Sequence, residues 1–163
     1  MRRSLSTPVG EPNRPAASAR RLNVAAAVIR NDLGQVFICR RGPDGREPLL
    51  WEFPGGKQEA DESLEACLAR ECLEELGLVA EAVGDPLLTV QGAGGLTLVF
   101  FRARLLGGRL RLNVHADCRW AWPRELSSFK FCPADEPVVA RLLLEADNRP
   151  NLASRTTSHN ALI

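Results

Sequence analysis

Paired cysteines are missing from this sequence. The five cysteines are odd in number and scattered, and no two of them form a C-x-x-C pair: Cys39, Cys67, Cys72, Cys118 and Cys132. Structural zinc sites and disulfide frameworks need paired or regularly spaced cysteines. We therefore expect reduced thiols, a cytoplasmic protein, and neither a zinc site nor a disulfide framework.

Three other patterns are also missing. No apolar run approaches the roughly 20 residues of a membrane-spanning helix, so we expect no membrane partner. No G-x-S-x-G motif occurs, and the only histidines, His115 and His159, are far apart, which argues against a serine hydrolase. Without a D-x-D-x-D-G loop, calcium storage of the EF-hand type is excluded as well.

Clustered basic residues are lacking in the middle of the chain. Residues 1–21 carry five arginines and one glutamate, and residues 148–163 carry two arginines and no acid. The remaining part, 22–147, holds 14 basic and 19 acidic residues, so its net charge is near −5. A groove for a nucleic-acid polymer needs clustered Lys and Arg. We expect no such partner, and an acidic domain that handles polyanions would need a cation between them.

The length of 163 residues suits one domain with two tails. Residues 1–21 are rich in Pro, Ser, Arg and Ala and have no hydrophobic period, which predicts a disordered extension. An organelle transit peptide is the alternative, but the prolines would spoil its amphipathic helix. Residues 148–163 are predicted to be a flexible tail, and the domain is expected at 22–147.

Apolar runs predict strands that come in hairpins. Residues 22–30 and 35–41 flank "NDLGQ", and residues 96–106 and 109–114 flank a Gly-Gly pair; both patterns indicate hairpins. Two shorter runs, "LLWEFP" and "RWAWP", are expected to be further strands.

Two helices are expected between and after these strands. The first begins after Ser63 as its N-cap and ends at Gly77, and the second covers 134–146, with Pro137 in its first turn. Because hairpins outnumber helices, we predict an α/β fold with a mixed sheet between helices, not a doubly wound parallel sheet.

The first helix collects negative charge at its C-terminal end. At about 100° per residue, Glu71, Glu74 and Glu75 share one face. Carboxylates at this end are unfavourable by roughly 0.3–1 kcal/mol each, and Glu71 with Glu75 is a like-charge i,i+4 pair. Arg70 is the only basic residue of the helix. A bound hard divalent cation would remove the conflict, so the three glutamates are predicted metal ligands.

These residues belong to a longer pattern. Gly56, Glu62 and the run "RECLEELGL" from Arg70 to Leu78 match G-x5-E-x7-R-E-U-x-E-E-x-G-U at every fixed position, with a cysteine at the apolar "U" site. The chain therefore resembles the Nudix hydrolases over about residues 22–147. The neighbouring "WEFPGGK" and "PADEPVVARL" are similar to the MutT-like, nucleotide-sanitising branch. The resemblance implies the Nudix fold and hydrolysis of a diphosphate linked to another group.

The resemblance also assigns the catalytic metal site. It implies that Glu71, Glu74 and Glu75 bind Mg²⁺, or Mn²⁺ in its place, with the Gly55 carbonyl as a further ligand. The metal would orient and acidify the attacking water. One of the three glutamates would accept the proton of this water, and the sequence does not say which one.

Other positions receive supporting or substrate-binding roles from the resemblance. Arg70 would orient Glu71, Glu62 would support the loop and the start of the helix, and Gly56 would let the backbone approach the phosphates. Arg41 matches a phosphate-contacting position, with a solvated arginine as the alternative. Glu52 matches a position near the nucleotide pocket, and it could also be a surface residue.

The chain departs from its MutT-like relatives at two positions. An auxiliary acidic ligand of the relatives corresponds to Val114, so this carboxylate is missing or is replaced from nearby, for example by Asp117. An arginine beside the base in some relatives corresponds to Gly94, so base packing must differ. His115 is expected to be a loop or strand residue and not a base.

Asp135 stands where MutT enzymes have asparagine. An ionised Asp only accepts hydrogen bonds, which suits the exocyclic amine of cytosine or adenine. A protonated Asp in an apolar pocket could also donate to an oxidised guanine. A third role, the N-cap of the last helix, is compatible with either.

The expected function is Mg²⁺-dependent cleavage of (deoxy)nucleoside triphosphates to NMP and pyrophosphate. Such an enzyme would clear 8-oxo-dGTP or cytidine-type nucleotides from the pool. One alternative keeps the chemistry but uses ADP-ribose or a dinucleoside polyphosphate, which the compact chain disfavours. The other is a nucleotide-binding regulatory module without turnover, which the intact motif disfavours. The preferred base and the oligomeric state stay open.

Overall fold

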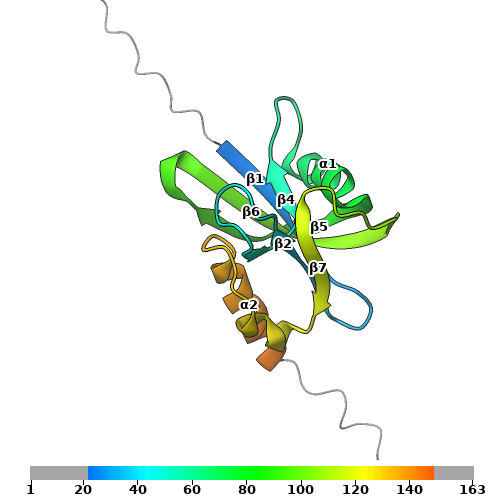
Figure 1. Cartoon of the computed structure of the whole chain (residues 1–163), viewed down its shortest axis with the longest axis vertical. Helices are drawn as coiled ribbons and strands as arrows, with labels where there is room; N and C mark the ends of the chain where they lie inside the picture. Colours follow the sequence, from blue (N-terminus) through cyan, green and yellow to red (C-terminus); the bar gives the residue numbers. More distant parts are fainter. Residues whose placement is uncertain (1–21, 149–163) are drawn as a thin grey trace, which may run out of the picture.

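The computed structural model of the chain describes residues 22–148 (Figure 1). The expected extension 1–21, and all but the first residue of the expected tail 148–163, lie outside the described residues. The five cysteines are all described and are free thiols. None of the helices in this part of the chain combines the length and apolar character needed to cross a membrane.

The first sheet has four strands in the order β4-β1-β6-β5. The strands are β1 (Leu22–Ile29), β4 (Gly55–Lys57), β5 (Leu78–Gln91) and β6 (Leu96–Gly108). β1 runs parallel to β6 and antiparallel to β4, and β5 runs antiparallel to β6. The sheet is therefore mixed, as predicted.

The second sheet is antiparallel and has the order β3-β2-β7. Its strands are β2 (Val36–Arg41), β3 (Trp51–Glu52) and β7 (His115–Ala121). β3 and β7 contain the core of the two short strands that the sequence predicted. This sheet carries Arg41, Glu52 and His115 towards the first helix.

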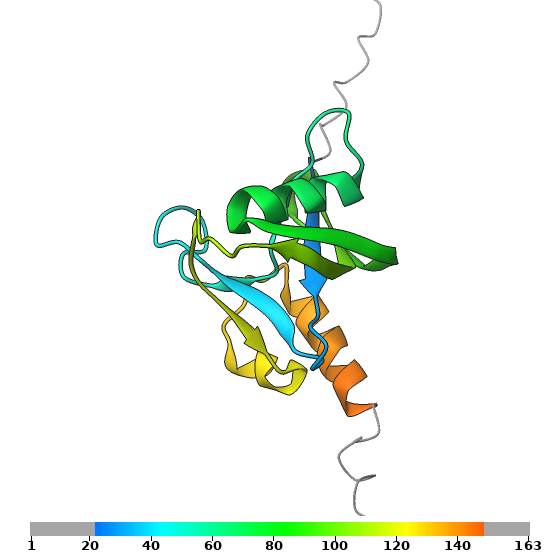
Figure 2. The same ribbon diagram turned by 90° about the vertical axis from the view of Figure 1, so that its right-hand side faces the viewer.

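Two helices flank the first sheet on opposite sides (Figures 1 and 2). Helix α1 (Leu64–Leu76) contacts β5, β1 and β4, and α2 (Glu136–Asp147) packs beside the 3₁₀ turn η2 (Pro123–Ser128); a shorter turn, η1 (Ala93–Gly95), joins β5 to β6. Alternation along β1 sends Ala25 and Ala27 into the core under α1, and Ala26 into the core under α2. The α/β class with a mixed sheet between helices is confirmed.

The ends of α1 agree with the prediction. The Ser63 side chain accepts from the Ala66 N–H at 3.1 Å. Gly77 adopts the left-handed conformation (φ 66°), and its N–H donates to the Leu73 carbonyl at 2.9 Å. Local capping chemistry therefore determines both ends of the helix that carries the glutamates.

The first predicted hairpin is present only at its turn, where the Asn31 N–H donates to the Gln35 carbonyl at 3.1 Å, and the second predicted hairpin is wrong. β1 and β2 belong to different sheets and share only the isolated bridge between Arg30 and Val36. β1 is buried on both faces and takes β4 and β6 as its neighbours. β6 does not form a hairpin with the residues after its two glycines but pairs with β5. Gly84 and Pro86 lie inside β5 and interrupt its apolar pattern, so the sequence did not predict this strand. Residues 109–114 are not a strand, and every second N–H in this segment, from Arg109, Arg111 and Asn113, donates to a carbonyl at the end of α1.

Candidate active site

Two adjoining cavities lie beside β4 and the second sheet, and the smaller one also reaches the C-terminal half of α1. One has a volume of about 590 Å³ and the other of about 540 Å³. Five residues line both and form their common wall: Arg41, Glu52, Gly55, Gly56 and Lys57. A ligand that reaches from one cavity to the other would therefore pass two cations and a glycine pair.

The smaller cavity contains two of the predicted metal ligands. Glu71 and Glu75 line it together with Gly55 and Gly56. A methyl group added at Gly56 would overlap the carboxylate of Glu71. Gly56 therefore lets the β4 backbone lie close to this carboxylate, which would have to shift if the residue had a side chain.

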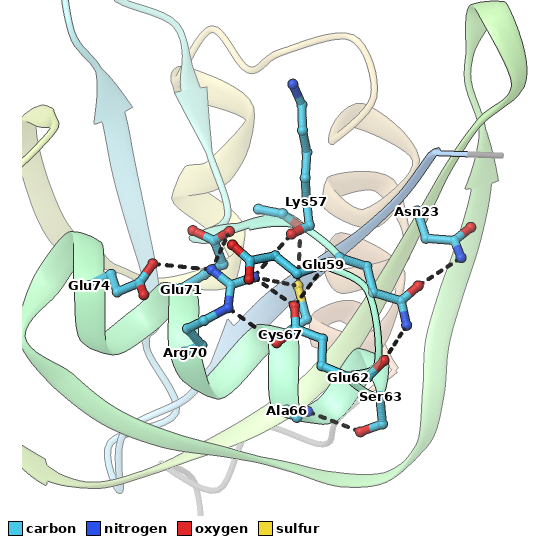
Figure 3. Close-up of polar contacts among 12 residues, drawn as sticks. Asn23, Lys57, Glu59, Glu62, Ser63, Ala66, Cys67, Arg70, Glu71 and Glu74 are labelled. Carbon is cyan, nitrogen blue, oxygen red and sulfur yellow. Dashed lines mark hydrogen bonds and ion pairs between the residues drawn. The ribbon is translucent and has the colours of Figure 1, made fainter. Parts of the chain in front are cut away.

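Arg70 binds acidic side chains of α1 and of the loop before it (Figure 3). Its guanidinium binds both oxygens of Glu62, at 2.7 and 3.1 Å, and Nη1 lies 3.1 Å from Glu71 and 3.1 Å from Glu74. The hydrogen bonds from Arg70 and from the Glu59 N–H lower the pKa of Glu62 to about 2. Arg70 therefore lines neither cavity, and its guanidinium holds the Glu71 carboxylate from outside the smaller cavity.

Glu74 lies at the edge of this cluster. Its side chain is 58% exposed, pairs with Arg70 and does not line either cavity. The structure therefore brings Glu71 and Glu75 together around the cavity and leaves Glu74 beside it.

Glu75 is half-buried between charged groups. Burial raises the pKa of the Glu75 carboxyl to about 7, against the lowering effect of His115. Glu71 and Glu52 raise it further. The positive charge near Glu75 does not offset the effect of burial on its carboxylate. A cation in the smaller cavity would stabilise the ionised form.

The oxygen donors of the smaller cavity are of the type that binds a hard divalent cation, but they are not arranged as a complete metal site. Among residues 22–148, no three His, Cys, Asp or Glu side chains converge on one point as a preformed metal site. Glu71 and Glu74 face Arg70, and Glu75 faces His115. Two carboxylates beside glycine backbone suit Mg²⁺, which keeps waters and shares substrate phosphates as ligands. The metal-ligand role of the three glutamates stays a prediction.

His115 is a site residue that the sequence analysis missed. Its Nε2 lies 3.3 Å from Glu52 and 3.9 Å from Glu75, and its side chain is 3% exposed. Within the described residues, Nδ1 is buried without a hydrogen-bond partner. Strand alternation could not have placed it, because the β2–β7 register shifts between Arg40 and Arg41, opposite His115.

The expected replacement for the missing auxiliary carboxylate lies elsewhere. Asp117 binds Arg119 at 2.6 Å and does not line the cavities, whereas Val114 does. The additional carboxylate on the wall of the smaller cavity is Asp44, from the loop after β2. No motif or spacing in the sequence predicts that Asp44 lies in the site.

The larger cavity has both apolar and charged walls. Phe53, Phe100 and Cys132 line it together with Asp135, and the ion pair between Arg41 and Glu52, 2.6 Å long, lies on the wall that it shares with the smaller cavity. Aromatic faces with one or two polar groups are typical of nucleobase pockets. Arg41 and Glu52 therefore lie where the two cavities meet, which suits their predicted substrate contacts.

Asp135 occupies the N-cap position of α2, but its side chain does not cap the helix. Its Oδ1 accepts from the Phe53 N–H at 2.9 Å, and the residue is 5% exposed. Burial raises the pKa of Asp135 to about 8, partly opposed by the bond from Phe53. The side chain thus belongs to the cavity and not to the helix terminus.

This raised pKa predicts a pH-dependent gain in stability for Asp135→Asn. Because the folded protein binds the proton more tightly than the unfolded chain does, the wild type loses stability as pH rises from about 4 to about 8. Asn keeps an oxygen for the Phe53 N–H and has no such loss. Urea unfolding should show equal stability near pH 4 and an advantage of at least about 1 kcal/mol for the variant near pH 8. A constant difference across this range would contradict the burial of a titrating carboxyl.

Comparison with known proteins decides the family. The NUDIX domain matches this chain over residues 19–153. The chain belongs to the Nudix family. This Nudix protein carries the motif intact, on the loop and helix that line the smaller cavity.

Relatives in the family carry names of nucleotide hydrolases. The 8-oxo-dGTP diphosphatase of Haemophilus influenzae is 48% identical over 131 residues, which cover 78% of this chain and 95% of that protein. The CTP pyrophosphohydrolase of Escherichia coli is 32% identical over 132 residues, 79% of this chain and 96% of that protein. The solution structure of the E. coli ORF135 protein superimposes with a TM-score of 0.64 at 31% identity, covering 85% of this chain and all of that one. The chain is a MutT-like hydrolase of phosphoanhydride bonds.

Proposed function

We propose that this Nudix hydrolase cleaves (deoxy)nucleoside triphosphates to the monophosphate and pyrophosphate, with Mg²⁺ or Mn²⁺ as the cofactor. The named activities of the H. influenzae and E. coli relatives support this class of substrate. Clearing damaged or surplus nucleotides is the corresponding role in the cell. Five free thiols support the proposal that the enzyme works in a reducing compartment, the cytoplasm.

One observation carries the proposal: the common wall of the two cavities. A cavity with aromatic walls and the buried carboxyl group of Asp135 adjoins a cavity lined by Glu71 and Glu75. A nucleoside fits the first by its chemistry, and a polyphosphate with its cation fits the second. Arg41 and Lys57 lie on the wall that the α-phosphate would cross.

The chain's residues would divide the work as follows. Glu71, Glu74 and Glu75, with the Gly55 carbonyl, would hold the metal, which lowers the pKa of the attacking water. One carboxylate of this set would accept the proton of the water. Arg70, tied to Glu62, would fix the side chain of Glu71, and Gly56 would keep the backbone close to it.

The base is proposed to be oxidised guanine or cytosine, according to the state of Asp135. When Asp135 is protonated, it presents a donor and an acceptor, as Asn does, which suits oxidised guanine. When it is ionised, it accepts only, which suits the amine of cytosine. Its raised pKa allows both states near neutral pH.

A substrate panel tests the proposed function. Natural, oxidised and methylated (d)NTPs, ADP-ribose and a dinucleoside polyphosphate are each incubated with the full chain, with and without Mg²⁺. We expect pyrophosphate release from triphosphates only, at the highest kcat/KM for 8-oxo-dGTP or dCTP, and loss of turnover with EDTA. Faster cleavage of ADP-ribose, or no turnover of any nucleotide, would overturn the proposal.

A further inference from the structure

The C-terminal end of α1 is held by a segment from outside the motif. Residues 109–113, named here the capping segment, run from the end of β6 past this helix end towards β7 (Figure 2). The N–H groups of Arg109 and Arg111 donate to the carbonyls of Gly77 (3.1 Å) and Leu76 (2.8 Å). The capping segment therefore supplies N–H donors to carbonyls at the C-terminal end of α1, where the helix itself has no further N–H groups to offer.

Asn113 makes the contacts nearest to the predicted metal ligands. Its backbone N–H donates to the Glu75 carbonyl at 3.1 Å, and its side-chain Nδ2 donates to the Glu74 carbonyl. One residue thus holds the backbone of two consecutive glutamates of the motif. Within residues 22–148, Asn113 is the one residue whose side chain donates a hydrogen bond to either of these carbonyls.

A neutral donor is needed at this place. The last carbonyls of a helix have no partners within it, and the N–H of Gly77 reaches only Cys72 and Leu73. The last turn of α1 contains no basic residue. A Lys or Arg there would satisfy the carbonyls but would also pair with the glutamates and compete with a metal ion. An amide satisfies the carbonyls without neutralising the carboxylates.

The same segment leads directly to the other contact of Glu75. Two residues after Asn113, His115 lies 3.9 Å from the Glu75 carboxylate. The backbone and the side chain of Glu75 are therefore both contacted by one short stretch of chain. A substitution in the capping segment would therefore affect both the backbone and the side chain of Glu75.

We propose that Asn113 is a positioning residue for hydrolysis: its side-chain amide, by holding the Glu74 carbonyl, sets where the carboxylates of Glu74 and the adjoining Glu75 present their oxygens to the metal ion. This inference rests on the proposed function, since it needs a divalent cation at the motif. Groups behind the ligands of a metal site typically change metal affinity or activity by about 10- to 100-fold when they are removed.

The test compares Asn113→Ala with Arg111→Ala in the full chain. Arg111 lies in the same segment, but its contact to Leu76 is made by its backbone N–H and survives the substitution. Three quantities are measured: Mn²⁺ binding without nucleotide by calorimetry, hydrogen exchange of the α1 amides, and kcat and KM for the best triphosphate. Asn113→Asp, of the same shape but without the donor, serves if the alanine variant does not fold.

For Asn113→Ala we expect Mn²⁺ affinity and kcat to fall by about 10-fold or more, with KM within about twofold of the wild type. Amides of the last turn of α1 should exchange faster, while those of its first turn stay unchanged. Arg111→Ala should match the wild type in all three. Unchanged Mn²⁺ affinity and kcat in Asn113→Ala and Asn113→Asp, or a kcat loss equal to the loss of folded protein, would overturn the inference. If the wild type hydrolyses no triphosphate, the proposed function fails, and Mn²⁺ binding and exchange still decide the role of Asn113.

Discussion

Glu75→Gln should lower kcat by about 10²- to 10⁴-fold, the range expected when a charged group that acts on the reacting water is lost. Gln keeps the volume of the side chain, so the fold should be retained. Glu75 lines the smaller cavity and is half-buried, and a neutral amide there would neither bind a cation strongly nor accept a proton. Pyrophosphate release at saturating Mg²⁺ and nucleotide measures the effect.

Glu65→Gln is the matched control, because Glu65 lies exposed in the first turn of the same helix. It should leave kcat unchanged. The thermal midpoint of Glu75→Gln should hold or rise, since the buried charge and the like-charge pair with Glu71 are removed. Near-normal turnover in both Glu75→Gln and Glu71→Gln would contradict the assignment of the cavity as the catalytic site.

The motif and its helix could be predicted because their signals are local. Ser63 and Gly77 are capping residues whose geometry depends on a few neighbours, and the glutamates follow from helical periodicity. The sheet could not be predicted in the same way. β1 pairs with β6, more than 60 residues later, and no turn residue between β1 and β2 reports that partner.

Which residues of the motif line the smaller cavity also depends on pairing between strands that are far apart in the sequence. Helical geometry placed Glu71, Glu74 and Glu75 on one face, but which of them lies over the cavity is decided by β2 and β7. The second sheet brings His115 and Glu52 to the side of Glu75, while Glu74 is left with Arg70. The sequence pattern predicts a strand over residues 109–114 and gives no indication that the Asn113 amide contacts the end of α1.

Asp135→Asn should change base selectivity, and the size of the change should depend on pH. Both side chains offer an oxygen to the Phe53 N–H, and neither is needed to cap α2, so the substitution tests the cavity alone. The raised pKa of about 8 means that Asp135 is mainly protonated near pH 6.5 and mainly ionised near pH 9. Only the ionised form differs from Asn in its hydrogen bonding, because it has lost its donor.

The wild type and Asp135→Asn should therefore have similar ratios of kcat/KM for 8-oxo-dGTP and dCTP near pH 6.5. Near pH 9 the ratio should favour 8-oxo-dGTP in the variant by roughly 5- to 150-fold, the equivalent of one unsatisfied buried polar group at about 1–3 kcal/mol. The variant itself should show little change of this ratio with pH, because its amide does not titrate in this range. Other titrating groups act on both proteins alike, so the comparison isolates residue 135. Equal ratios for the two proteins at both pH values would show that this side chain does not contact the base, and its role would then be limited to holding the Phe53 backbone.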